Sequence, residues 1–117
     1  MTVPPAQSVP DALRAFIVGS IESVEACEVL LSLHAGSNRS WSAKEVSRAL
    51  KLPLSAAQAH LETLARRGLL DVRLTSDLRY RLAPVRTEVG VLIALLGTLY
   101  RANPAVVADI VASKPAS

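Results

Sequence analysis

The 117-residue sequence has few aromatic residues and a single cysteine, and each shortage excludes a class of protein. Aromatic side chains make up 3% of the chain, so the core must be aliphatic, and the abundance of Leu and Ala favours helices over a β-sandwich. One cysteine, Cys27, excludes an intramolecular disulfide framework and suits a reducing compartment. The four aromatic residues are Phe16, Trp41, Tyr80 and Tyr100.

The sequence also lacks the usual signals of catalysis, metal binding and membrane insertion. His34 and His60 are 26 positions apart and have no metal-ligand spacing, so we expect neither a metal nor another cofactor. Neither a Ser/His/acid arrangement nor a Gly-rich phosphate loop is present, which argues against an enzyme. We see no signal peptide, and the uncharged stretch 89–100 has 12 residues, too few to span a bilayer. We therefore expect a soluble, cytoplasmic protein.

Hydrophobic periodicity predicts two helices near the N-terminus. Residues 1–10 contain three prolines and no charge, which indicates a flexible arm. Asp11 is expected to cap a first short helix, and a second helix is expected from Glu22 to Ala35. Three glutamates of this second helix are predicted to face solvent: Glu22, Glu25 and Glu28.

Two capping-box patterns predict the next two helices. The pairs are Ser42 with Glu45 and Ser55 with Gln58, each three residues apart. At this spacing the serine side chain can accept from the backbone N–H of the later residue, whose own side chain can accept from the backbone N–H of the serine. Trp41 is expected to act as a hydrophobic staple before the first box. The first helix should end near residue 51, and the second should run from 55 to 67 before Gly68 stops it. The buried stripe expected for the second helix consists of Ala57, Leu61 and Leu64.

The hydrophobic period then changes from 3.6 to 2, and later returns to a helical pattern. Residues 70–74 and 78–82 alternate apolar and polar around a turn at 75–77, which predicts a β-hairpin with one solvated face. Residues 86–101 predict a helix that is apolar on nearly every side, and a short helix follows the break at 103–104.

A helix that is apolar all round needs more cover than so small a domain provides, so we expect a homodimer in preference to a membrane-surface helix. The resulting organisation is an arm at 1–10, a main domain at 11–84, dimerising helices at 85–113 and a tail at 114–117. The expected dimer contacts are Val89, Leu92, Ile93, Leu96, Leu99 and Tyr100.

The order of these elements resembles that of a known family. The segments ALKLPLSAAQAHLETLARRGLL and DVRLTSDLRYRL are similar to the winged helix domains of MarR- and ArsR-like transcriptional regulators. The resemblance implies a mainly α fold with a small β-hairpin, a winged helix-turn-helix with extra N- and C-terminal helices. It also implies that residues 55–67 enter the DNA major groove while the hairpin, or wing, contacts the backbone. Lys51 departs from the pattern, because a glycine is common at that position.

Charge is concentrated on the suspected motif. Between positions 39 and 86 lie ten basic and four acidic residues, a net of +6, while the rest of the chain has a net of −3. Such a basic segment can neutralise DNA phosphates, so we predict duplex DNA as the partner. The candidate DNA-contacting residues are Lys44, Ser55, Gln58, His60, Thr63, Arg66, Arg67, Arg73, Arg79 and Arg81.

Several of these residues admit a structural interpretation as well. Gln58 can cap its own helix or read adenine, and His60 can contact phosphate or pack beside the core. Cys27 is either a small buried hydrophobe or, as in some MarR-like regulators, a redox sensor. The predicted recognition helix is rich in alanine and carries Glu62, which phosphates would repel. A second hypothesis is therefore a winged helix adaptor that binds a protein instead of DNA.

Overall fold

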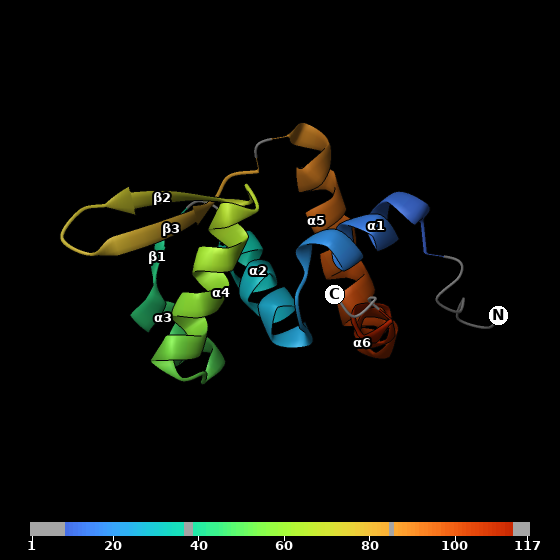
Figure 1. Cartoon of the computed structure of the whole chain (residues 1–117), viewed down its shortest axis with the longest axis horizontal. Helices are drawn as coiled ribbons and strands as arrows, with labels where there is room; N and C mark the ends of the chain where they lie inside the picture. The colour runs from blue at the N-terminus through green and yellow to red at the C-terminus, as the bar shows by residue number, and fades with distance from the viewer. Residues whose placement is uncertain (1–8, 37–38, 85, 114–117) are drawn as a thin grey trace.

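The computed structural model describes residues 9–36, 39–84 and 86–113 and confirms the expected winged helix fold (Figure 1). In chain order, the elements are α1 (Asp11–Ser20), α2 (Val24–Ala35), β1 (Trp41–Ser42), α3 (Ala43–Leu50), α4 (Leu54–Arg66), β2 (Leu70–Leu74), β3 (Leu78–Leu82), α5 (Thr87–Ala102) and α6 (Pro104–Ala112). The prediction placed the hairpin and helices α3, α4 and α5 within one or two residues of these bounds, and it expected the short helix that follows the break at 103–104. It missed β1.

The hairpin and the terminal helices lie at opposite ends of the molecule. Figure 1 shows β2 and β3 projecting from one end, α3 and α4 below them, and α1, α5 and α6 at the other end. Helix α2 lies between the two groups and packs against α3, α4 and α5. One core cluster therefore runs through both groups. The terminal helices α5 and α6 belong to the same core as the residues before position 84. Its fully buried large side chains include Ile17, Leu30, Leu33, Leu61, Leu64, Ile93, Leu96 and Ile110.

The three strands form an antiparallel sheet in the order β1-β3-β2. Trp41 of β1 lies opposite Tyr80 of β3, and Val72 of β2 lies opposite Tyr80 on the other side. Strand β2 is therefore an edge strand. Strand β1 was not predicted because its two residues are too few to show an alternating pattern. It is recognised as a strand only by its pairing with β3.

The capping box at the start of α3 is confirmed. Ser42 Oγ accepts a hydrogen bond from Glu45 N at 3.2 Å, and Glu45 Oε1 accepts one from Ser42 N at 2.9 Å. The helix ends at Lys51, which adopts the left-handed conformation with φ 57° and ψ 47°. This conformation explains why a glycine would be favoured there, since a side chain at positive φ is strained.

The starts of the first two helices differ from the prediction. Asp11 is already the first residue of α1, and Pro10 occupies the cap position. Helix α2 starts at Val24 instead of Glu22, because the Ser23 side chain accepts a hydrogen bond from Ala26 N at 3.1 Å. A serine hydroxyl in this position satisfies an N–H that the first turn would otherwise leave without a partner.

The second predicted capping box is wrong. Helix α4 begins at Leu54 with Pro53 at its cap, so Ser55 lies inside the first turn and Gln58 lies beyond the position from which a box could close. Proline has a fixed φ near that of a helix and starts this one a residue early. Both Ser55 and Gln58 are consequently exposed.

Parts of two predictions fall outside the described residues, namely most of the arm at 1–10 and the tail at 114–117. Among the helices that the structure does describe, none is by itself long and apolar enough to cross a bilayer. Helices α5 and α6 meet the length and composition criteria only together, and they bend by 115° at their junction.

Candidate nucleic-acid interface

Helices α3 and α4 form a helix-turn-helix whose second helix presents a free polar face. The predicted buried stripe of α4 is confirmed, since Ala57, Leu61 and Leu64 have at most 1% of their surface exposed. This stripe anchors α4 against α2 and α3. The opposite face is exposed and consists of Ser55, Gln58, Ala59, Glu62 and Arg66.

The first turn of α4 lies next to the start of α3. Lys44 and Gln58 line a cleft of about 270 Å³ between these helices and the wing, together with Leu54 and Leu78. Lys44 is exposed and has no ion pair within the described ranges. A lysine beside the first turn of a helix adds positive charge where the helix dipole is also positive, which favours an anion.

The other end of α4 carries two arginines in different settings. Arg66 is exposed, and its Nη2 donates to Thr63 Oγ1 at 3.2 Å. Arg67 donates to the backbone oxygen of Gly19 and so links the end of α4 to α1. The predicted DNA contacts at this end of α4 are Thr63, Arg66 and Arg67. Arg66 is the best placed of them to bind a ligand, because Arg67 takes part in holding the helices together.

His60 faces the protein interior instead of the exposed face of α4. Its Nε2 lies 2.8 Å from Glu25 Oε1, and its side chain is only 15% exposed. Glu25 was expected to face solvent and is instead half-buried in this pair. The packing interpretation of His60 is therefore the one that its geometry favours.

The three wing arginines share one face of the hairpin, as strand alternation predicts. Arg73 lies directly opposite Arg79, and Asp71 lies opposite Arg81. These four side chains, with Ser40 and Thr75, line a groove of about 370 Å³. Arg73 is paired with Asp71 at 3.2 Å but remains 73% exposed, and Arg81 is exposed without an ion pair among the described residues.

Arg79 is held more firmly than the other two. Its Nη2 donates to Glu45 Oε1 at 2.8 Å and to the backbone oxygen of Ser40 at 3.0 Å. Its Nε donates to Ser40 Oγ at 2.9 Å, and its Nη1 lies 3.4 Å from Asp77. With 26% of its side chain exposed, Arg79 joins the wing to the start of α3 more than it offers charge to a ligand.

The opposite face of the hairpin is apolar and is only partly covered. Leu70 and Tyr80 are buried at its base, but Val72 is 42%, Leu74 78% and Leu78 41% exposed. We call Val72, Leu74 and Leu78 the apolar wing face. We expected one face of the hairpin to be solvated and the other buried. Both faces meet solvent toward the tip, because the hairpin extends beyond the helices there.

The residues expected to form a dimer lie mostly inside the single chain. Ile93 and Leu96 are fully buried, and Val89, Leu92, Leu99 and Tyr100 pack against the same core. Helix α5 is covered by α1, α2 and α6, which together hide the apolar surface that seemed too large for one chain. The large apolar side chains of α5 that are exposed are Val91 and Leu95, at 57% and 43%.

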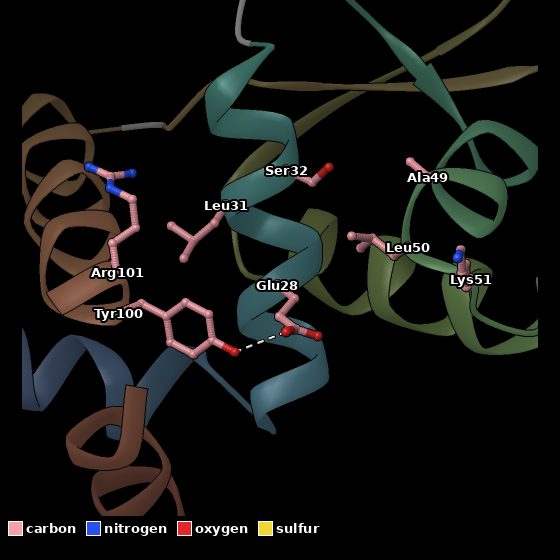
Figure 2. A pocket seen from close by; sticks show the side chains of 8 residues that line it. All are labelled: Glu28, Leu31, Ser32, Ala49, Leu50, Lys51, Tyr100 and Arg101. Carbon is pink, nitrogen blue, oxygen red and sulfur yellow. Dashed lines mark hydrogen bonds between the residues drawn. The ribbon is translucent and has the colours of Figure 1, made fainter. Parts of the chain in front are cut away.

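A further cleft of about 460 Å³ lies between α2, the end of α3, and α5. Figure 2 shows Tyr100 and Glu28 reaching toward each other across it, and the Tyr100 hydroxyl donates to Glu28 Oε2 at 2.9 Å. Burial and the Glu28 carboxylate raise the pKa of Tyr100 to about 12. Within the part of the chain that the structure describes, no group of three His, Cys, Asp or Glu could hold a metal.

The comparisons with known proteins agree with this architecture. Residues 28–73, from α2 through most of β2, match the IclR helix-turn-helix domain. The fold is similar to that of reduced HlyU from Vibrio cholerae N16961, with a TM-score of 0.57 and 27% identity over 80% of this chain and 92% of that one. No curated protein matches the sequence. Neither finding names the MarR or the ArsR group, so that subtype stays a prediction. The chain therefore has a winged helix-turn-helix fold, and its helix-turn-helix segment is similar to that of the IclR type.

Proposed function

We propose that this chain binds duplex DNA as a homodimer and regulates transcription. The observation that carries the proposal is the exposed face of α4, the second helix of the helix-turn-helix, which holds Ser55, Gln58 and Arg66. In this class of fold that helix lies in the major groove, where Gln can pair with adenine and Arg with guanine. Such a regulator acts on DNA in the cytoplasm, and the proposal includes no catalytic step.

Charge supports a role for residues on both sides of α4. Lys44 lies beside the first turn of α4. Arg73 and Arg81 extend from the wing with exposed side chains. The wing arginines lie on the hairpin face turned away from α4, so they would reach phosphates outside the groove that α4 occupies. Phosphate contacts of this kind supply affinity without reading sequence.

A two-fold dimer would present two copies of α4 to a pseudo-palindromic site. The exposed Val91 and Leu95 are four residues apart on α5 and so lie on one side of the helix. We propose this pair as the centre of the dimer contact, with the half-buried Leu92, three residues before Leu95, beside it. Leu95→Asp should then weaken the self-association measured by analytical ultracentrifugation, and an unchanged sedimentation profile would remove α5 from the interface.

Single substitutions test the DNA contacts. Duplex affinity, measured by fluorescence anisotropy at low salt, should fall for Lys44→Ala, Gln58→Ala and Arg81→Ala. Arg101→Ala is the matched control, because Arg101 is an exposed cation on α5 outside the proposed interface. The proposal requires Arg101→Ala to bind like the unmodified chain. Equal losses for all four variants would mean that the protein attracts DNA through total charge alone.

The adaptor hypothesis keeps one specific observation in its favour. The apolar wing face adjoins Leu54, itself 45% exposed, and the exposed carboxylate of Glu62 lies on the next turns of α4. Apolar surface of this kind contributes more to a protein contact than to a phosphate contact. Under this hypothesis Leu78→Ser would abolish capture of a protein partner, while Lys44→Ala and Arg81→Ala would have no effect on it.

A further inference from the structure

Strand β2 has one free backbone edge. It pairs with β3 alone, and Figure 1 shows the hairpin extending away from the helices. Ala83 N donates to Leu69 O at 3.0 Å, and Thr75 N donates to Asp77 O at 3.0 Å. Because such bonds alternate along an antiparallel pair, Asp71 and Arg73 direct their backbone groups to β3. The N–H and C=O groups of Leu70, Val72 and Leu74 therefore point to the free edge.

The sequence of β2 is complementary to its own reverse. It reads Leu70-Asp71-Val72-Arg73-Leu74, with an acid and a base placed symmetrically around the central valine. If two copies align antiparallel about Val72, each Asp71 lies opposite the second copy's Arg73, and each Leu70 lies opposite the second copy's Leu74. All charges then fall on one face of the joined sheet and all apolar side chains on the other.

We propose that β2 pairs edge to edge with the β2 of a second copy of this chain, forming one sheet that continues across a two-fold axis. The backbone agrees with this register, since residues 70, 72 and 74 are those that have N–H and C=O groups available. Pairing also places Val72 and Leu74, now 42% and 78% exposed, against their counterparts. The contact does not depend on DNA binding, and it is separate from the proposed contact through α5.

The charges already present on the wing favour such a partner. Arg73 lies directly opposite Arg79 within the hairpin, and like charges in that position are unfavourable. Within one chain, Arg73 Nε lies 3.2 Å from Asp71 Oδ2. The Asp71 of the second copy would bring another carboxylate to the other side of Arg73. The four charges of the two edges would then alternate in sign. Five residues per strand make a small interface, so we expect weak, concentration-dependent association.

Charge reversal gives a matched set of variants. Asp71→Arg or Arg73→Asp alone places like charges opposite each other across the axis. In the Leu95→Asp background, which lacks the proposed α5 contact, each should lose the self-association that remains. The double variant Asp71→Arg/Arg73→Asp restores opposite charges and should recover it. All three share the Leu95→Asp substitution in α5, so sedimentation differences among them report on β2, and circular dichroism verifies that each is folded. Failure of the double variant to exceed both single variants would overturn the proposal.

Two further variants test the backbone contact. Val72→Pro removes an N–H that faces the free edge, so the hairpin should remain folded while edge pairing is lost. Val72→Cys places a thiol on the two-fold axis and should form a disulfide-linked dimer under mild oxidation. Ser76→Cys is the control, because Ser76 is an exposed turn residue outside the paired region. Crosslinking of both cysteine variants at equal rates, or association unchanged in a folded Val72→Pro protein, would contradict edge pairing.

Discussion

Arg79 Nη2 lies 2.8 Å from Glu45 Oε1, and this ion pair connects the wing to the start of α3. The same carboxylate oxygen accepts the backbone N–H of Ser42 in the capping box. Arg39 approaches the other oxygen of Glu45 at 3.3 Å. One glutamate thus completes a helix cap and also fixes the wing relative to the helix-turn-helix.

Replacement of Arg79 should affect stability, whereas replacement of Arg81 should not. Arg79→Ala removes the bonds to Glu45 and Ser40, so we expect a loss of about 1.5–3 kcal/mol in the free energy of unfolding, the range for hydrogen bonds to charged groups. Arg81→Ala should stay within about 0.5 kcal/mol, as is usual for surface substitutions. Urea unfolding of both variants measures the difference. Equal losses would show that Arg79 is not a structural link.

Acid should weaken the same network. The Ser42 backbone N–H, with Arg79 and Arg39 nearby, holds the pKa of Glu45 below its ordinary value of 4.5, although partial burial opposes this. The stabilisation is therefore present above pH 4.5 and is lost as the pH falls through the lower, folded-state pKa. The destabilisation caused by Glu45→Gln should be largest near neutral pH and should shrink in acid. A mutational effect independent of pH would contradict the assigned role.

Lys51→Gly should stabilise the protein. Lys51 adopts φ 57°, where a side chain costs roughly 1–2 kcal/mol and glycine has no such penalty. Glycine also gives up more chain entropy on folding, so we expect a net gain of about 0.5–1 kcal/mol. Thermal unfolding measures the gain, and Lys51→Ala, which keeps the Cβ atom, should not show it. A gain of equal size in both variants would instead point to removal of the lysine charge.

Cys27 should be unreactive in the folded protein. Its side chain is fully buried, and burial together with the nearby Glu28 carboxylate raises the pKa of the thiol to about 12. Because the thiolate is the reactive form, iodoacetamide should not modify Cys27 at neutral pH until the chain is unfolded. Rapid modification of the folded protein would revive the redox-sensor interpretation.

Local sequence patterns were sufficient to predict most of the fold. The stripe Ala57, Leu61 and Leu64 and the capping box of Ser42 with Glu45 were read correctly, because both depend on spacing within a few residues. The shared face of the wing arginines also followed from strand alternation. The cap at Pro53 was missed because a plausible Ser55 to Gln58 box was present two residues later.

The contacts of the candidate site could not be predicted, because they join residues far apart in the chain. His60 with Glu25, and Arg79 with Glu45, are tertiary pairs that no local pattern encodes. Because of these pairs, the side chains of His60 and Arg79 are less available to DNA than the sequence predicted. The exposure of Val72 and Leu74 was likewise hidden, since an alternating strand has the same pattern whether or not a helix covers its apolar face.

The salt dependence of duplex binding by the unmodified chain tests the central claim most directly. If α4 and the wing neutralise phosphates, affinity should be highest at low salt, and log affinity should fall linearly with log salt by about 0.9 for each phosphate neutralised. Arg81→Ala should make that slope shallower by about one. Absence of binding at low salt, or binding that does not change with salt, would contradict the assignment of this winged helix protein as a DNA-binding regulator.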